Sequence, residues 1–259
     1  MTDESLEKEL RDYIQQVADE KHMSFERVLY AMIAAVQRAE HKEERGTMLI
    51  KELAAVIHQN AVDHGWWDEP REMPEVVALI HSEWSEALEE ARAGRPLVWY
   101  ACGEAENSTI PCNPKDDDEC RMYGREGECQ FRGHKPEGIA VELIDGCIRI
   151  LDAMGYSGVE MTEPDTLEPT SFDALMGKHR AVLPEEMPED AATLIAWLHA
   201  FTSQAMLEDD ESVVRETHLI SAMSLALCWV QARGVDPLAL LLEKHEYNKG
   251  RPYKHGKKF

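Results

Sequence analysis

Long apolar runs, glycine and proline are all scarce in this chain of 259 residues. No stretch approaches the roughly 18 apolar residues that a membrane span needs, so we expect no membrane association. The chain contains only 15 Gly and 12 Pro, and many stretches are rich in Ala, Leu and Glu, which predicts an all-α protein. Hydrophobic residues make up 44% of the chain, enough for a sizeable core in one large domain or two small ones.

Basic residues are also few, with 27 Lys and Arg against 50 Asp and Glu and a formal net charge of −23. Such a charge favours solubility and opposes general nucleic-acid binding, so we expect no nucleic acid among the partners. The N-terminal sequence MTDESLEKEL is acidic and is unlike a signal peptide, so a cytoplasmic location is expected. Residues 244–259, however, contain six Lys or Arg and one Glu. We expect this basic tail either to fold back onto an acidic face or to hold an anion.

Cysteine pairs at the Cys-x-x-Cys spacing are absent. Four cysteines lie in a stretch of little periodicity, residues 97–135: Cys102, Cys112, Cys120 and Cys129. They are candidates for a structural Zn²⁺ site, although intervals of nine, seven and eight residues are a weak signal for zinc. Free thiols and disulfides are the alternatives, and a reducing cytoplasm opposes disulfides. Cys147 and Cys228 sit in apolar helices and are expected in the core.

Two acidic pairs are the most informative feature of the sequence. Glu83 and Glu86 lie in HSEWSEALEEARAG, and Glu142 and Asp145 lie in PEGIAVELIDGCIRILDAMG. Apolar residues recur at three- and four-residue steps in both segments, as in amphipathic helices, so each pair shares a helix face. Two such helices packed together would bring four carboxylates to one place, which is tolerable only around a cation. All-oxygen ligation favours Mg²⁺ or Mn²⁺.

A solvated helix face is the alternative interpretation of either pair in so acidic a chain. The second pair fits that alternative less well, because it interrupts an otherwise apolar stretch and buried carboxylates need partners. Neither pair carries the Glu-x-x-His pattern of di-iron bundles, which disfavours a metal-storage protein.

The sequence pattern divides the chain into segments. Helices are predicted at residues 5–21, 24–41, 47–64, 73–93, 136–155, 188–207, 212–233 and 236–246. The segments are an N-terminal helical hairpin (1–46), a helical half (47–159) with the cysteine-containing insertion (97–135), a linker (160–171), a second helical stretch (172–243) and the basic tail (244–259). Gly65 and Gly155 are expected to end two of the helices. The hairpin carries no evident chemistry and is expected to pack against the body or to make a subunit contact.

Residues 47–159 and 172–243 have the pattern of a tandem repeat. Met73-Pro74-Glu75 opens the first acidic helix, and Met187-Pro188-Glu189 opens a later helix 114 residues further on. The second copy lacks the acids, since the residues opposite Glu83, Glu86, Glu142 and Asp145 are Trp197, Ala200, Ser221 and Ser224. The first copy would then carry the chemistry and the degenerate second copy would be scaffold. A chance similarity between amphipathic helices is the alternative.

Together these motifs resemble a known family. Glu83-x-x-Glu86 followed by Glu142-x-x-Asp145 resembles the metal-binding signature of the all-α nucleoside triphosphate pyrophosphohydrolases, the MazG-like and dimeric dUTPase group. HGWWDEPREMPEVVALIHSEWSEALEEARAGRP and PEGIAVELIDGCIRILDAMG are similar to helices of its MazG-like bacterial and phage members, and EKHEYNKGRPYKHGKKF is similar to their C-terminal segment. The resemblance covers about residues 48–155 and 216–259. The cysteine insertion and residues 160–215 depart from the minimal family pattern, which leaves substrate choice and subunit arrangement, such as a homodimer, open.

The resemblance implies hydrolysis of a (deoxy)nucleoside triphosphate to the monophosphate and pyrophosphate, with Mg²⁺ held by the four acids. The chemistry agrees, because an acidic site binds so anionic a substrate only through cations, which also activate the attacking water. Glu86, with Glu83 beside it, is the candidate general base. Four residues of the tail are spaced to reach phosphate oxygens, if the tail is ordered: Lys244, Asn248, Arg251 and Lys254.

Three residues near the third predicted helix are candidates to bind a base: His58, Asn60 and Trp67. Trp66 and Trp67 are adjacent, and the alternative to stacking on a base is core packing, because two tryptophans bury a large area. His58 and Asn60 are either base-reading groups or surface residues. The alternative function is a non-catalytic helical regulatory or adaptor protein, with the acids as solvated faces and the cysteines holding zinc.

Overall fold

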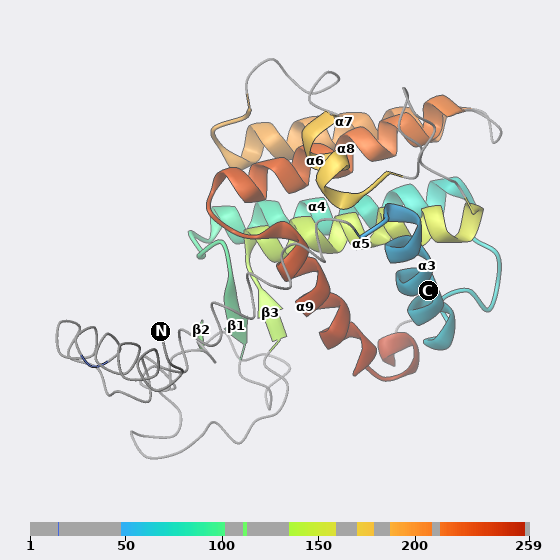
Figure 1. The fold of residues 1–259 in the computed structure, drawn as a ribbon, viewed down its shortest axis with the longest axis horizontal. Helices are drawn as coiled ribbons and strands as arrows, with labels where there is room; N and C mark the ends of the chain where they lie inside the picture. The colour runs from blue at the N-terminus through green and yellow to red at the C-terminus, as the bar shows by residue number, and fades with distance from the viewer. Residues whose placement is uncertain are drawn as a thin grey trace, which may run out of the picture. The chain divides into compact units, whose positions relative to one another are not determined.

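Seven α-helices make up most of the described chain (Figure 1). The computed structural model describes residue 15 and residues 48–101, 111–112, 135–158, 170–178, 187–208 and 213–256. The chain separates into two units, Met1–Met48 and Leu49–Phe259, and each is considered by itself. The predicted hairpin of residues 1–46 lies outside the described residues except for Gln15. The prediction of a mostly helical protein is confirmed.

Within Leu49–Phe259 the helices lie in three layers (Figure 1). The central layer is the pair α4 (Met73–Arg92) and α5 (Ile139–Ser157). On one side of this pair lie α6 (Phe172–Lys178), α7 (Ala191–Leu207) and α8 (Val213–Ala232). On the other side lie α3 (Ile50–Asp63), α9 (Pro237–Lys249) and the 3₁₀ turn η2 (Tyr253–Gly256). The α4–α5 pair therefore presents one face to α3 and α9, and the candidate site lies on that face.

The predicted end of α5 at Gly155 is wrong. The helix continues to Ser157, and Gly158 ends it in the left-handed conformation with φ of 65°. Gly155 has a packing role instead. A Cβ there would lie 2.5 Å from the Cβ of His58 and 2.6 Å from the carbonyl oxygen of Ala54, both on α3. The close approach of α3 to α5 therefore depends on the missing side chain.

The start of α7 also differs from the prediction. Met73-Pro74-Glu75 opens α4 as expected, but the matching Met187-Pro188-Glu189 precedes α7, which begins at Ala191. Asp190 caps α7, because its side chain accepts a hydrogen bond from the amide of Thr193 at 2.8 Å. The carbonyl oxygen of Pro188 instead accepts a hydrogen bond from the indole of Trp229 on α8, at 2.9 Å.

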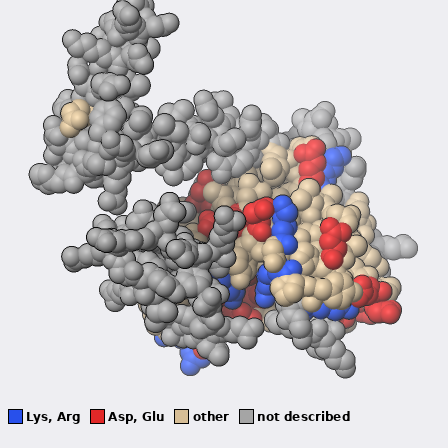
Figure 2. Space-filling model, turned by 90° about the horizontal axis from the view of Figure 1, so that it is seen from below, with Lys and Arg blue, Asp and Glu red and all other residues tan. Residues whose placement is uncertain are grey.

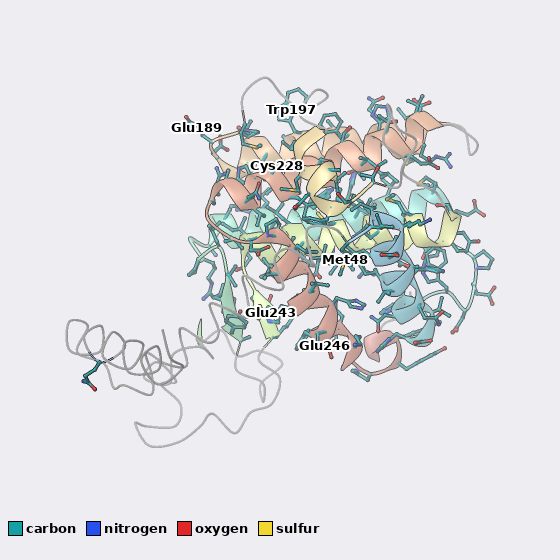
Figure 3. The ribbon with its side chains drawn as sticks, viewed as in Figure 1. Met48, Glu189, Trp197, Cys228, Glu243 and Glu246 are labelled. Carbon is teal, nitrogen blue, oxygen red and sulfur yellow. The ribbon has the colours of Figure 1, made fainter. Side chains whose placement is uncertain are left out.

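A small antiparallel sheet stands where the sequence predicts no strands. β1 (Trp99–Ala101) pairs with both β2 (Pro111–Cys112) and β3 (Lys135–Glu137). Strands this short carry no readable alternation, which is why the sequence shows only little periodicity here. β1 and β3 place the two ends of the predicted insertion side by side. The Tyr100 hydroxyl of β1 donates to Glu243 of α9 at 2.6 Å and so ties the sheet to that helix (Figure 3).

The predicted linker of residues 160–171 is described only at its end. Ser171 forms a bridge with Leu49, and the amide of Ile50 donates to the carbonyl oxygen of Thr170 at 2.9 Å. The segment before α6 is thereby attached to the start of α3. Across the described residues, no single helix has the length and apolar character of a membrane span, and only α8 and α9 taken together across a 110° bend meet that test.

The central layer packs against the layer of α6, α7 and α8 at a fully buried tryptophan. Trp84 of α4 donates its indole N–H to the Thr202 hydroxyl of α7 at 3.1 Å. A Cβ on Gly146 of α5 would lie 2.2 Å from the Trp84 ring. Close packing here therefore requires the combination of one very large side chain and one absent side chain.

Gly146→Ala should accordingly destabilise the protein. The added methyl would overlap the Trp84 ring, and overpacking of a buried contact costs about 1–3 kcal/mol. Gly250→Ala is the matched control, because Gly250 has φ of −82° and its nearest heavy atom to a new Cβ would be 3.5 Å away. Chemical denaturation of both variants checks this expectation. Equal free energies of unfolding for the two variants would contradict it.

Candidate metal centre and its cavity

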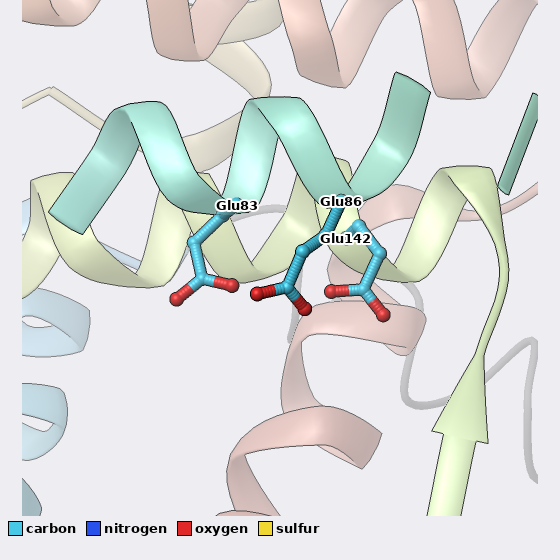
Figure 4. Close-up of side chains that lie close together, drawn as sticks. All are labelled: Glu83, Glu86 and Glu142. Carbon is cyan, nitrogen blue, oxygen red and sulfur yellow. The ribbon is translucent and has the colours of Figure 1, made fainter. Parts of the chain in front are cut away.

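Three glutamates from the α4–α5 pair converge at one end of their shared face (Figure 4). Glu83 and Glu86 lie one turn apart on α4, and Glu142 lies in the first turn of α5. One carboxylate oxygen from each lies within 4.8 Å of the other two. Glu83 and Glu142 are buried and Glu86 is exposed, so the cluster is open on one side. Three hard oxygen donors at this spacing suit Mg²⁺ or Mn²⁺.

Burial perturbs two of these acids. It raises the pKa of Glu142 to about 9, against the opposing effect of the nearby Lys244 ammonium, and Asp145 adds to the increase. Burial also raises the pKa of Glu83, although Arg149 opposes the shift by donating a hydrogen bond to Glu83 at 3.0 Å. Without a cation, Glu142 therefore carries a proton near neutral pH, and a divalent ion would displace that proton.

Asp145, the fourth predicted metal ligand, has a different partner. Its Oδ2 lies 2.9 Å from Nζ of Lys244, which also donates to the carbonyl oxygen of Pro136 at 3.2 Å. Lys244, the first residue of the predicted tail, lies in α9, and only 1% of its surface is exposed. Burial alone would lower the pKa of Lys244, but Asp145 and Glu142 outweigh that effect and raise it. The ammonium therefore stays charged as a buried counter-ion, and three of the four predicted acids remain grouped.

A cavity of about 450 Å³ adjoins the three glutamates. Residues of α4 and α5 form its floor, and residues of α3 and α9 form its two sides. Along α4 the floor extends from Glu75 to Glu86, which is about 16 Å at about 1.5 Å per residue. We call the region around Glu86 and Glu142 the carboxylate end. The far end is the region lined by four residues: Asn60, Trp66, Arg71 and Asp152.

Charges of both signs line this cavity, although the chain is strongly acidic. The cationic lining residues come from five different places in the sequence: Arg71, Lys135, Arg149, Lys244 and Arg251. Figure 2 shows acidic and basic side chains interspersed on the described part of one face of the molecule. The cavity can therefore accept a ligand that is itself anionic, provided that a cation accompanies it.

Asp152 is the fixed acid of the far end. Its Oδ1 accepts a hydrogen bond from Nδ1 of His58 at 2.8 Å and another from the indole of Trp67 at 2.9 Å. Burial raises the pKa of Asp152, and these two donors oppose the shift. Trp67 is held in turn by stacking on Tyr156, with ring centroids 4.2 Å apart. Of the predicted base-binding residues, His58 and Trp67 hold Asp152 from outside the cavity, and Asn60 lines it.

The C-terminal segment packs against the turn that follows α3. Nε2 of His64 lies 2.9 Å from the carbonyl oxygen of Arg251, and the amide of Lys254 donates to the carbonyl oxygen of His64 at 3.0 Å. Asp68 accepts a hydrogen bond from the Tyr253 hydroxyl and forms an ion pair with Lys254 at 2.9 Å. This docking places residue 251 at the rim of the cavity.

The predicted phosphate-binding residues therefore have different environments. Asn248 and Arg251 line the cavity, and Oδ1 of Asn248 is buried without a hydrogen-bond partner among the described residues. Lys244 lines the cavity but is engaged by Asp145. Lys254 is paired with Asp68 and is not a lining residue. Asn248 and Arg251 are thus the two tail-side groups available to an anion.

The lining residues that the sequence prediction of the site missed include Arg71, Arg149 and Asp152. The sequence could have predicted two of them, because Arg149 and Asp152 follow Asp145 at intervals of four and seven residues and so share its helix face. Arg71 lies in the turn before α4, where no periodicity applies. Its guanidinium is fixed by an ion pair with Glu75 at 3.1 Å and lies 5.6 Å from the centre of the Trp66 ring.

The predicted zinc site falls almost wholly outside the described residues. Cys102, Cys120 and Cys129 are not described, and only the backbone of Cys112 is described, in β2. The Zn²⁺ site therefore stays a prediction. Cys147 is fully buried, as predicted for a core residue. Cys228 (Figure 3) is only partly buried, and its thiol lies 3.6 Å from a carbonyl oxygen of α6.

The metal-free protein should lose stability as the pH rises through neutrality. Because the folded-state pKa of Glu142 is raised to about 9, its contribution is fully present below about pH 4.5 and is lost progressively up to about pH 9. The slope from this group is at most about 1.4 kcal/mol per pH unit. Mg²⁺ should reduce the loss, and Glu142→Gln should flatten the slope. Denaturation between about pH 6 and pH 9 measures both, and a Gln variant with an unchanged slope would contradict the assignment.

Gly65→Ala should release the C-terminal segment. Gly65 has φ of 75°, and a Cβ there would lie 2.2 Å from the Tyr253 ring. Gly94→Ala is the matched control, since Gly94 has φ of 66° with nothing within 4 Å of a new Cβ. Both variants should lose about 1–2 kcal/mol from the left-handed backbone. Trypsin should cleave after Lys254 faster in Gly65→Ala than in Gly94→Ala. Equal cleavage rates would show that docking of the C-terminal segment does not depend on the contact between Gly65 and Tyr253.

Comparisons with known proteins found no relative of this chain. No protein-family model matches the chain, no curated protein matches it, and no solved structure matches it. The resemblance to the MazG-like group therefore stays a prediction from the sequence. The functional interpretation rests on the geometry of the three glutamates, the cavity beside them and the cationic residues that line it.

Proposed function

We propose that this protein is a metal-dependent hydrolase that converts (deoxy)nucleoside triphosphates to the monophosphate and pyrophosphate. One observation carries the proposal: three glutamates within 4.8 Å of one another form one end of a cavity whose lining also includes cationic and apolar side chains. A triphosphate needs both features, namely a cation site and direct donors for its oxygens. The cavity length of about 16 Å suits an elongated ligand of this kind.

Glu83, Glu86 and Glu142 would hold Mg²⁺ or Mn²⁺. The donor set fits such an ion, because all three groups are carboxylates and two of them are buried with raised pKa values. Bound there, the ion supplies neutralisation of phosphate charge and polarisation of the phosphoryl group. Lys244 keeps Asp145 compensated beside the cluster. We therefore assign Asp145 to the surroundings of the ion through Lys244, and the three glutamates to the ion itself.

Glu86 is the candidate general base. It is exposed to the cavity and makes no hydrogen bond or ion pair to another described residue, so the carboxylate oxygen that it does not give to the ion is available to a water molecule. In the proposed reaction the water oxygen bonds to the α-phosphorus while Glu86 accepts a water proton. The bond from that phosphorus to the oxygen that bridges the β-phosphorus breaks, and pyrophosphate leaves with that oxygen.

Three side chains are positioned to bind and orient the phosphates. Arg251 and Asn248 line the cavity from the tail side, and the side-chain amide nitrogen of Asn248 can donate a hydrogen bond to a phosphate oxygen. Arg149 donates Nε to Glu83, and its terminal nitrogens make no hydrogen bond to a described residue. Guanidinium groups match phosphate oxygens in bidentate fashion, so Arg149 and Arg251 would fix the chain of phosphates from two directions.

The two helical pairs support the proposed tandem repeat. α4–α5 and α7–α8 are each formed by neighbouring helices in the chain, and the pairs lie in adjacent layers (Figure 1). Ser221 and Ser224 of α8 are buried and uncharged, and Trp197 of α7 is 45% exposed (Figure 3). The second pair therefore has no carboxylates at the positions opposite the site. In this proposal it serves as scaffold for the first.

Glu142→Gln should abolish metal-dependent turnover and leave the fold intact. Loss of a ligand should cost at least about 100-fold in activity, since even partners of ligands cost 10–100-fold. Stability should be unchanged or higher, because an amide is cheaper to bury than a carboxylate. Glu246→Gln is the control, since Glu246 is exposed on α9 (Figure 3) and, among the described residues, its ion pair is with Lys249.

The measurement is pyrophosphate release from all canonical NTPs and dNTPs, with Mg²⁺, with Mn²⁺ and with neither. Release that requires the ion and is lost in Glu142→Gln but kept in Glu246→Gln supports the proposal. No release from any of these substrates, or full activity in Glu142→Gln, contradicts it.

A further inference from the structure

The far end of the cavity carries polar groups that the proposed reaction does not use. Asp152 of α5 and Asn60 of α3 line it, together with Arg71 from the turn before α4. Apolar side chains from α3 and α4, such as Ile57 and Leu79, complete its lining. A flat apolar ring with a polar edge fits such a surface, because its faces need apolar contact and its edge needs fixed donors and acceptors.

Asp152 offers one oxygen to a ligand. Its Oδ1 is already engaged by two donors, Nδ1 of His58 and Nε1 of Trp67. No described residue donates a hydrogen bond to its Oδ2, although Asp152 is only 6% exposed. The residue lines the cavity, so Oδ2 is an acceptor held in place without a donor among the described residues. Such an acceptor is costly to leave unpaired once a ligand has excluded water.

The position of Asp152 relative to the glutamates sets what part of a ligand it meets. Asp152 follows Glu142 by ten residues on α5, or about 15 Å along the helix. If the phosphates of a nucleotide lie at the carboxylate end, the nucleoside extends toward the far end. Asp152 then faces the edge of the base and not the phosphates, which its charge would repel.

The donors around Asp152 also define the rest of that edge. Arg71 uses Nε for its ion pair with Glu75 and lines the cavity beside Trp66. The side-chain amide of Asn60 makes no hydrogen bond to a described residue and lines the cavity as well. A base at the far end of the cavity therefore meets one fixed acceptor, Oδ2 of Asp152, next to the donor groups of Arg71 and Asn60. This order matches a base edge on which an amino group stands beside acceptor atoms.

We infer that Asp152 is a specificity-determining residue that selects triphosphates whose base carries an exocyclic amino group, in preference to uracil and thymine. The inference rests on the proposed function. An exocyclic amino group donates a hydrogen bond to Oδ2. The keto oxygen at the same place in uracil or thymine is itself an acceptor, so it cannot form this hydrogen bond with Oδ2. His58 and Trp67 act through Asp152 as positioning residues. Sites that hydrogen-bond a substrate group in this way reject analogues that lack it far more strongly than apolar pockets do.

Matched substrates test the inference without any variant. dCTP and dUTP differ in the amino or keto group at C4 and in the N3 hydrogen that accompanies the keto form, and dATP and dITP form the corresponding purine pair. The ratio of kcat/KM within each pair should favour the amino-bearing substrate by roughly 10- to 100-fold, the value of one buried hydrogen bond to a charged group. A ratio near one, or a preference for dUTP, overturns the inference while pyrophosphate release itself leaves the proposed function standing.

Asp152→Asn should lower both ratios to one or below, because the Trp67 indole keeps the amide oxygen at the place of Oδ1 and the amide nitrogen then donates where Oδ2 had accepted. Trp67→Phe should lower the ratios more weakly, since it removes one donor to Oδ1 and keeps a ring to stack on Tyr156. Asp173→Asn is the control, as Asp173 is exposed on α6 and should leave the ratios unchanged. Ratios that are unchanged in Asp152→Asn overturn the inference.

A binding measurement separates the two proposals. Tryptophan fluorescence reports binding of dCMP and dUMP to the metal-free protein, because Trp66 lines the cavity. Tighter binding of dCMP, lost in Asp152→Asn, supports the inference even if no triphosphate is hydrolysed and the proposed function fails. Equal binding of dCMP and dUMP overturns it.

Discussion

Compensation of buried acids along α5 is the constraint on which the rest of the structure depends. α5 carries acids at positions 142, 145 and 152 on the face that lines the cavity, and a buried carboxylate needs a donor or a counter-ion. Each acid draws on a different element. Lys244 brings α9 to Asp145, and His58 brings α3 to Asp152. Glu142 shares the charge of Lys244 but also lies beside Asp145 and Glu137, and burial together with these two acids raises its pKa. The walls of the cavity and the cation site thus arise from the same requirement.

The same constraint explains how a chain with a net charge of −23 can accommodate an anion. The acids around the cavity are not a solvated acidic patch, because most of them are already bonded to a cation or a donor from another element. Arg149 binds Glu83, and Arg71 binds Glu75, so the arginines are anchored at one end and present their remaining donors to the cavity. Pre-positioned guanidinium groups lose little conformational entropy when they bind phosphate. An acidic scaffold therefore serves to orient its few cationic side chains.

Local periodicity predicted which residues share a face of one helix, but it did not predict the contacts between residues of different helices. The face shared by Glu83 and Glu86, and the burial of Glu142, follow from three- and four-residue spacing alone. The partner of Asp145 does not, because Lys244 is 99 residues away in the sequence and a lysine at the start of a basic tail is expected to be exposed. The same limit applies to Gly155, which sequence alone cannot distinguish as a helix end or a packing contact. Strands of two or three residues leave no periodic signal at all.

Pairing of β1 with β3 has a consequence for how this fold can change in length. Ala101 and Lys135 are directly opposite one another in the sheet, so the chain leaves the helical body and returns to it at a single place. The free energy of closing a loop grows only with the logarithm of its length, by about 0.6 kcal/mol for each doubling. The chain between β2 and β3 can therefore lengthen, shorten or be exchanged for an unrelated module at almost constant cost to the helices that carry the glutamates. The pairing of β1 with β3 makes this point of the chain a natural graft site, at which regulation or binding can be added without altering the geometry of the centre.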